Sequence, residues 1–110
     1  MARTKTEFII VIVTVPGLKE GTRISKAVLT SRLAACVAII PGTRSMYWWK
    51  GKIARSQEAM LVVKTTKLLY QKLEKKIMTL HSYEVPEIIA IPLVGGLPQY
   101  LEWIKREVAN

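Results

Sequence analysis

Hydrophobic residues gather in continuous runs in some parts of the chain and recur at helical spacing in others. The first run, EFIIVIVTV at residues 7–15, is rich in β-branched residues, which is typical of a strand buried on both faces and so central in its sheet. Pro16 and Gly17 end this strand. Further extended segments are predicted where turn residues bound an apolar or alternating pattern: CVAII at 36–40, SMYWW at 45–49, KIARSQEAMLVVKTT at 52–66 and EIIAIPLV at 87–94.

The segments at 36–49 and 52–66 are expected to pair as one long β-hairpin, because Lys50-Gly51 between them is a turn signal. The Pro41-Gly42 pair predicts a bulge or a bend within its first strand. Pro92 indicates that the last strand ends there or lies on a sheet edge.

Three segments carry apolar residues at helical spacing. The first is expected from about residue 19 to residue 35, the second over 67–80, and the third from Pro98, a residue favoured in a first turn. The residues predicted to face the core are Ile24, Ala27, Val28 and Ser31 in the first helix, Leu69, Leu73, Ile77 and Leu80 in the second, and Leu97, Leu101, Ile104 and Val108 in the third.

The resulting order of strands and helices predicts an α+β fold. It is the order of a ferredoxin-like βαββαβ sandwich, in which helices pack on one face of an antiparallel sheet, with an extra C-terminal helix. We expect a single domain over residues 7–110, preceded by a flexible basic tail at residues 1–6. Such a fold hosts many functions and does not by itself indicate one.

The apolar content adds an expectation about assembly. Hydrophobic residues make up 50% of the chain and its mean hydropathy is +0.21. The longest apolar run, Phe8 to Val13, is nevertheless far shorter than the roughly 20 residues of a membrane-spanning helix. We therefore expect no direct membrane insertion. Surplus apolar surface in a short chain favours a buried subunit interface instead.

The chain is strongly basic, with a net charge of +9, and all eight of its acidic residues are glutamates. A basic balance suggests nucleic acid as a partner. The cations are, however, spread over several segments, and those of the second predicted helix (Lys72, Lys75 and Lys76) have no aromatic residues interleaved with them. A solvated basic surface is the favoured interpretation, and no nucleic-acid partner is predicted.

The single cysteine, Cys36, excludes an internal disulfide, which is typical of a reducing cytoplasm. Cys36 and the only histidine, His81, are also too few for a structural zinc site within one subunit. The sequence has no aspartate and offers no nucleophile–base pair, so no enzymatic activity is predicted. Within its apolar run, Cys36 is interpreted first as a small buried hydrophobic residue and second as a metal ligand.

His81 falls at the end of the second predicted helix, and two interpretations of it stay open. It is either a charge partner for the helix terminus or one ligand of a weak, exchangeable divalent-cation site together with carboxylates such as Glu87. The metal candidates are therefore His81, Cys36 and Glu87.

A second group of polar and aromatic residues predicts a binding cleft. Glu58 and Lys64 share one face of the third strand by their even spacing, so they form either a structural salt bridge or part of a polar pocket with His81 and Tyr83. Tyr47 and Trp49 also share a face and are expected at a core or an interface, with an aromatic-walled cleft between subunits as the functional version. The cleft residues are Tyr47, Trp49, Glu58, Lys64 and Tyr83.

Six short motifs in order, RLAACVAI, SMYWWKGKI, Glu58, VVKTT, HSYEVPEIIAIP and YLEWI, closely resemble the CutA divalent-cation tolerance family over about residues 8–108. The positions that match the family pattern are Cys36, Ser45, Tyr47, Trp49, Gly51, Lys52, Glu58, Lys64, Thr65, His81, Tyr83, Pro86 and Glu87. Two positions depart from it. Ala38 replaces a common Asn, which removes a polar group near the candidate site, and Ser82 replaces a common Pro, which is expected to loosen the turn that aims His81.

The resemblance implies a homotrimer whose sheets pack around a three-fold axis, and the single cysteine leads us to expect this trimer in the cytoplasm. It also implies a role in the binding, tolerance or response of the cell to a divalent metal, with copper or another divalent cation weakly bound at subunit boundaries. The alternative is a trimer similar to the PII signalling proteins, which acts as a scaffold and binds a small anion or a partner protein.

Overall fold

The computed structural model describes residues 7–109 and confirms the predicted order of elements, with one added 3-10 turn. The predicted tail at residues 1–6 lies outside the described residues, and the domain bounds of 7–110 stay a prediction. The elements are β1 (Phe8–Val15), α1 (Leu18–Thr30), β2 (Cys36–Trp49), β3 (Lys52–Thr66), η1 (Lys67–Leu69), α2 (Tyr70–Leu80), β4 (Ile88–Pro92) and α3 (Pro98–Glu107).

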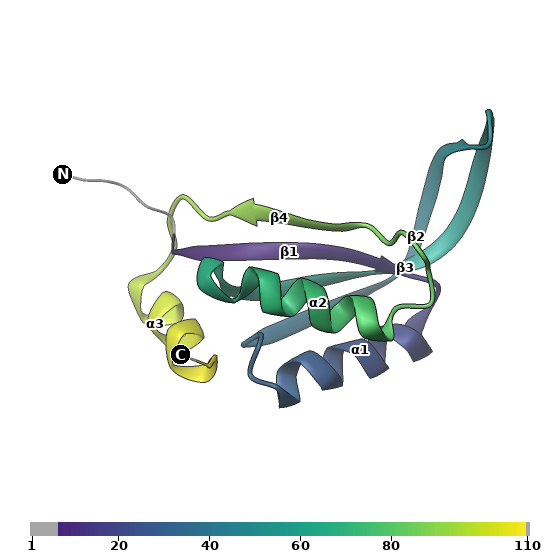
Figure 1. Ribbon diagram of the computed structural model, residues 1–110. Helices are drawn as coiled ribbons and strands as arrows, with labels where there is room; N and C mark the ends of the chain where they lie inside the picture. Colours follow the sequence, from purple (N-terminus) through teal and green to yellow (C-terminus); the bar gives the residue numbers. More distant parts are fainter. Residues whose placement is uncertain (1–6, 110) are drawn as a thin grey trace.

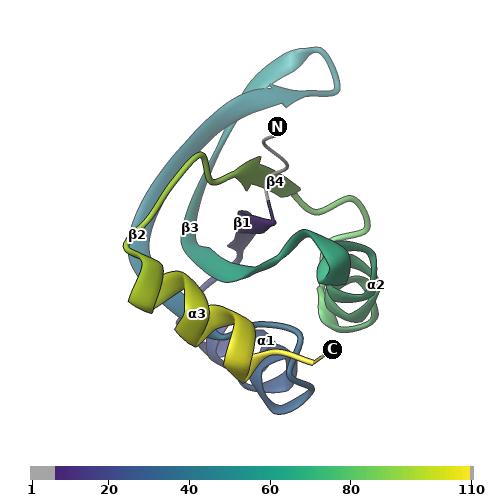
Figure 2. The ribbon, with the colours of Figure 1, turned by 90° about the vertical axis from the view of Figure 1, so that its left-hand side faces the viewer.

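The four strands form one antiparallel sheet in the order β2-β3-β1-β4. The apolar run of β1 is central, as its composition predicts, and Pro92 ends an edge strand. Helices α1 and α2 cover one face of the sheet, while α3 lies near the end of the sheet where β2 begins (Figures 1 and 2). The ferredoxin-like α+β fold is thereby confirmed.

The first helix is shorter than its apolar spacing predicts, because it ends at Thr30 rather than near residue 35. Arg32 adopts a positive φ of 60°, and the Leu33 N–H reaches back to the Val28 carbonyl at 3.0 Å. This is a Schellman ending of the helix, at which glycine is the usual residue. An arginine in that position gives no sequence signal for the ending, so the apolar pattern runs past it.

The β2–β3 hairpin is longer than the rest of the sheet and bends away from it (Figure 1). Its pairing shifts between Ile40 and Thr43, where Gly42 has a φ of +71°, so the predicted bulge is confirmed. At the tip, Lys50 and Gly51 both have positive φ, which is the geometry of a tight type I′ turn that matches the twist of paired strands.

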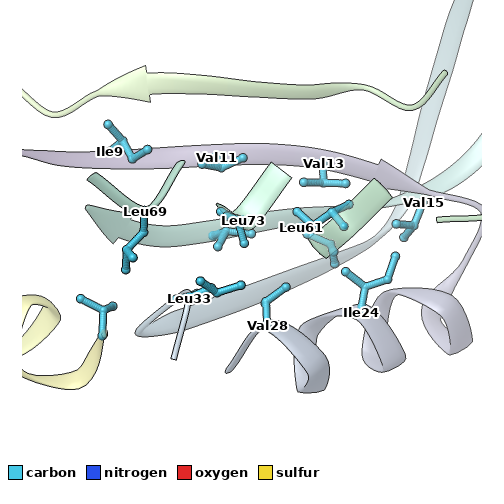
Figure 3. Close-up of a cluster of buried hydrophobic side chains, with 14 of the residues drawn as sticks. Ile9, Val11, Val13, Val15, Ile24, Val28, Leu33, Leu61, Leu69 and Leu73 are labelled. Atoms are coloured by element: carbon cyan, nitrogen blue, oxygen red, sulfur yellow. The ribbon is translucent and has the colours of Figure 1, made fainter. Parts of the chain in front are cut away.

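The core lies between the sheet and the helices (Figure 3). Alternate residues of β1 and β3 point into it and are almost fully buried, and both helices direct apolar residues toward them. The labelled side chains of this cluster are Ile9, Val11, Val13, Val15, Ile24, Val28, Leu33, Leu61, Leu69 and Leu73. All three predicted helix stripes contribute buried residues, including Ile77 and Ile104.

Among residues 7–109, no helix packs over the opposite side of the sheet (Figure 2), and we call this side the helix-free face. Strand register places on it Ile10, Ile12, Cys36, Ala38, Ile40, Met60, Val62, Lys64, Ile89 and Ile91. Ile40, Ile89 and Ile91 are 48%, 51% and 48% exposed. Neighbouring exposed apolar residues on one sheet face are typical of an interaction surface.

Candidate functional site

His81 follows the last residue of α2, and its side chain is completely buried. Its Nε2 lies 2.7 Å from the Thr14 carbonyl, and its Nδ1 accepts a hydrogen bond from the Tyr83 backbone N–H at 3.0 Å. Because Nδ1 accepts, Nε2 must carry the hydrogen and donate it to Thr14. This pattern assigns the neutral Nε2–H tautomer to His81.

The hydrogen bond from His81 to Thr14 lies just beyond the end of the pairing between β1 and β4. β4 pairs with β1 only as far as Val13, and the carbonyl of the next residue accepts from the imidazole instead. His81 is thus part of the backbone hydrogen bonding of β1. Neither ring nitrogen is free to bind a metal ion while these two bonds persist.

The carbonyl at the end of α2 is satisfied by a different residue. The Arg23 guanidinium, from α1, donates to the Leu80 carbonyl at 2.9 Å. Arg23 is therefore the charge partner of the α2 C-terminus, a role that one interpretation of the sequence gives to His81.

Glu20 of α1 holds the turn that follows His81. Its Oε2 accepts from the backbone N–H of Ser82 at 2.9 Å and from the Ser82 hydroxyl at 3.0 Å. Burial raises the pKa of Glu20, but the two hydrogen bonds from Ser82 and the positive charge of Arg23 outweigh this effect, so the pKa lies below its ordinary value. The expectation that Ser82 loosens this turn is wrong, since it forms two bonds that a proline cannot make.

Tyr83 links this turn to the hairpin through a buried carboxylate. Glu58 is only 7% exposed; it accepts from the Tyr83 hydroxyl at 2.8 Å and from the Ser45 hydroxyl at 2.7 Å. The hydroxyls of Tyr47 and Ser56 hydrogen-bond to each other on the same face of the hairpin. The structure therefore brings together three of the predicted cleft residues: Tyr47, Glu58 and Tyr83.

The contact with Glu58 makes Tyr83 sensitive to alkaline pH. Burial, followed by the hydrogen bond to Glu58 and its charge, raises the pKa of Tyr83 to about 12. In the unfolded chain a tyrosine ionises near its ordinary value of about 10. The stability that the neutral phenol contributes is therefore fully present below pH 10 and is lost as the pH rises toward 12.

We expect Tyr83→Phe to lower the free energy of unfolding by roughly 1.5–3 kcal/mol at neutral pH, because a hydrogen bond to a buried carboxylate is lost. The variant should also lack the part of the alkaline destabilisation that Tyr83 causes, about 1–2 kcal/mol between pH 10 and 12. Denaturant unfolding at a series of pH values measures both. Tyr47→Phe, which removes a more exposed hydroxyl, is the control; equal losses in the two variants would contradict the assignment.

Lys64 lies apart from this cluster, although its spacing places it on the same strand face as Glu58. The two residues are six positions apart on β3, or about 20 Å along the strand. Lys64 pairs across the sheet with Cys36, and its Nζ donates to the Tyr100 hydroxyl of α3 at 3.1 Å. That bond raises the pKa of Lys64. Neither the predicted Glu58–Lys64 salt bridge nor the predicted pocket with Lys64 forms within one chain.

The three predicted metal ligands also lie apart from one another in the structure. Cys36 is half-buried on the helix-free face, Glu87 is exposed just before β4, and His81 is enclosed in the junction described above. Over residues 7–109 no group of three or more histidine, cysteine, aspartate or glutamate side chains is placed to hold a metal ion. The three predicted metal ligands are therefore not brought together within a single described chain.

Sequence reasoning missed the partners that fix this site: the Thr14 carbonyl, Glu20, Arg23 and Tyr100. Glu20 and Ser82 are 62 positions apart, and Lys64 and Tyr100 are 36 apart, so no spacing rule connects them. The only available signal was an acidic residue in the first turn of a predicted helix, which the helix dipole also explains.

Comparisons with known proteins agree with this fold over nearly the whole chain. The family model described as "CutA1 divalent ion tolerance protein" matches residues 9–107. The divalent-cation tolerance protein CutA of Thermus thermophilus is 44% identical over 97 residues, which cover 88% of this chain and 94% of that protein. The chloroplastic CutA 1 of rice is 43% identical over 103 residues.

Solved structures of relatives are also similar to this chain over nearly its whole length. The crystal structure of CutA1 from Oryza sativa has a TM-score of 0.92 at 41% identity, covering 97% of this chain and 98% of that one. The Thermus thermophilus protein has a TM-score of 0.91 at 41% identity, covering 93% and 99%. The chain spans 58% and 56% of the full length of the rice and Arabidopsis relatives. On these matches, the chain belongs to the CutA1 divalent ion tolerance protein family.

Proposed function

We propose that this protein acts in divalent-cation tolerance as a homotrimer, and that any copper or other divalent ion it takes up is held between subunits. Family membership supports the connection with divalent cations. The observation that carries the proposal is the helix-free face, whose isoleucines Ile40, Ile89 and Ile91 are about half exposed in the single chain. Apolar surface of this extent is typical of an obligate interface.

A site between subunits also accounts for the separation of the metal candidates within one chain. Cys36 lies on the helix-free face and Glu87 is exposed near the edge strand β4, so donors from two copies can meet where one chain supplies too few. A thiolate favours Cu(I), and carboxylates suit harder divalent ions. His81 then serves to position Tyr83 and the loop, not to bind the metal.

Native mass spectrometry of the protein, alone and with increasing copper or zinc, tests this proposal. We expect a trimer that takes up metal at low excess, with copper uptake lost in Cys36→Ser and retained in His81→Asn. A monomer at micromolar concentration would overturn the assembly. A trimer that stays free of metal would overturn the binding role and leave the scaffold alternative.

One observation favours that alternative, a PII-like trimer that binds a small anion. Within residues 7–109, Lys64 has no carboxylate within salt-bridge distance; its ammonium donates to the Tyr100 hydroxyl and lies 5.4 Å from the centre of the Tyr100 ring. A lysine so placed on the helix-free face is suited to an anion at a subunit boundary. Anion binding that is lost in Lys64→Met while the trimer persists would favour this function. We also expect, as a proposal, a cytoplasmic protein without enzymatic activity.

A further inference from the structure

The outward side of helices α1 and α2 is strongly basic. The two helices contain six cations: Lys19, Arg23, Lys26, Lys72, Lys75 and Lys76. Five of them are exposed and Lys76 is half-buried. We call this set the basic helix face. It is turned away from the sheet, because the apolar residues of both helices point into the core (Figure 2).

Helical spacing places these cations in two neighbouring rows. Residues three or four positions apart lie on the same side of a helix. One row follows α1 and consists of Lys19, Arg23 and Lys26, and the other follows α2 and consists of Lys72, Lys75 and Lys76. The two helices pack against each other, and the Arg23 guanidinium reaches the Leu80 carbonyl at the C-terminal end of α2. The rows are therefore parts of one continuous surface.

Carboxylates of the same helices do not neutralise the basic helix face. α1 and α2 contain two acidic residues, Glu20 and Glu74. Glu20 accepts two hydrogen bonds from Ser82, and Glu74 accepts one from the Tyr70 hydroxyl at 2.9 Å. Among residues 7–109, none of the six cations has a carboxylate within salt-bridge distance. The potential of this surface therefore attracts an anionic partner.

The basic helix face stays accessible in the proposed trimer. Assembly through the helix-free face covers the side of the sheet opposite to α1 and α2 (Figure 2). The helices then lie on the outside of the assembly, with the sheet between them and the subunit interface. Three copies place three such faces around the axis. The inference rests on the proposed function for this placement alone.

We propose that the basic helix face binds a flexible acidic segment of a partner protein, rich in glutamate or aspartate. Carboxylates on one side of a helical or an extended segment recur about every 5–7 Å, which matches the spacing of cations within a row. One exposed ion pair contributes little, so binding requires several pairs at once, and two rows supply them. The exposed hydroxyls of Thr22 and Thr30 on α1 can also hydrogen-bond to peptide N–H and C=O groups.

Other anionic partners fit this face less well. Five of its six cations are lysines, whereas arginine supplies the paired donors that match a phosphate group. The one aromatic residue of the two helices, Tyr70, is half-buried and bonded to Glu74, so no ring is free for the bases of a single strand. Over residues 7–109, no helix is long and apolar enough to cross a membrane. A flat anionic bilayer would meet the outward faces of a trimer only one at a time.

Fluorescence anisotropy of a labelled oligoglutamate peptide tests the proposal. We expect saturable binding at low ionic strength that weakens as salt screens the exposed charges. Lys26→Gln/Lys72→Gln, which removes one cation from each row, should weaken binding roughly tenfold, because each exposed ion pair changes affinity by a few-fold. Lys26→Arg/Lys72→Arg keeps both charges and should bind the peptide as the unsubstituted protein does.

The matched control is Lys105→Gln/Arg106→Gln, which removes two exposed cations from α3, outside the basic helix face. It should weaken peptide binding by less than about twofold. Equal losses in the two glutamine variants would show a general charge effect and overturn the proposal. Binding of inorganic polyphosphate or of a single-stranded oligonucleotide, without binding of oligoglutamate, would also overturn it and assign the face to phosphate.

Native mass spectrometry of the same samples measures assembly separately from peptide binding. A monomer whose peptide binding is lost in Lys26→Gln/Lys72→Gln would overturn the trimer and support the site for an acidic segment. A trimer that does not bind the peptide would overturn this inference and leave the proposed assembly in place.

Discussion

Replacing Ile89 and Ile91 with glutamate is expected to convert the proposed trimer into monomers. Both residues belong to the short edge strand β4 and direct their side chains onto the helix-free face, where they are 51% and 48% exposed in the single chain. Because they are already half exposed, the fold of the chain itself should tolerate the change. Assembly would instead bury several uncompensated carboxylates close to one another, which costs several kcal/mol.

A penalty of about 4 kcal/mol weakens assembly about 10³-fold, enough to shift micromolar protein from trimer to monomer. Sedimentation velocity measures the change directly. Leu68→Glu is the matched control, since Leu68 is 89% exposed in η1, outside the helix-free face, and this variant should remain a trimer. If the Ile89→Glu/Ile91→Glu variant stays trimeric with normal affinity, the helix-free face is not the interface.

The elements that could be predicted from the sequence are those that follow from local periodicity. The β-branched run of β1, the stripe of Leu73 and Ile77 in α2 and the Lys50-Gly51 turn all carry a signal within a few residues, and all occur as predicted. The α1 end is the exception, because Arg32 occupies a left-handed position that usually signals itself by glycine.

The candidate site could be predicted only in part, since its geometry depends on contacts between distant segments. Even spacing correctly places Glu58 and Lys64 on one face of β3. It does not show that β1 ends beside Glu58 and that α3 reaches Lys64, so the two residues meet different partners. A period of two fixes which face a side chain occupies, but the length of the neighbouring strand decides what lies there.

The role of His81 also depends on contacts with distant segments that its local sequence does not show. Its place at a helix end predicts a charge partner for the helix terminus, and its chemistry predicts a metal ligand. The structure gives it two neutral hydrogen bonds instead, because β4 stops short of Thr14 and the loop returns Tyr83 to the ring. A histidine so held fixes the distance between β1 and the loop that carries Tyr83 to Glu58.

The expected result of His81→Ala is therefore a loss of stability of roughly 3–5 kcal/mol. The substitution leaves the Thr14 carbonyl and the Tyr83 N–H without partners in a buried region, and it also opens a cavity where a fully buried ring stood. A histidine that served only the helix dipole would cost about 1 kcal/mol. Denaturant unfolding at fixed protein concentration separates the two, since assembly makes stability depend on concentration.

Two conservative variants identify which bond matters. Asparagine at position 81 keeps an acceptor near the place of Nδ1 and should preserve the Tyr83 contact, while glutamine keeps a donor near the place of Nε2 and should preserve the Thr14 contact. Each is expected to recover part of the stability that alanine loses. Recovery by neither, together with loss of metal uptake in all three variants, would return His81 to the role of a ligand. Recovery by both, with metal uptake unchanged, would establish it as the residue that joins β1 to the Tyr83 loop.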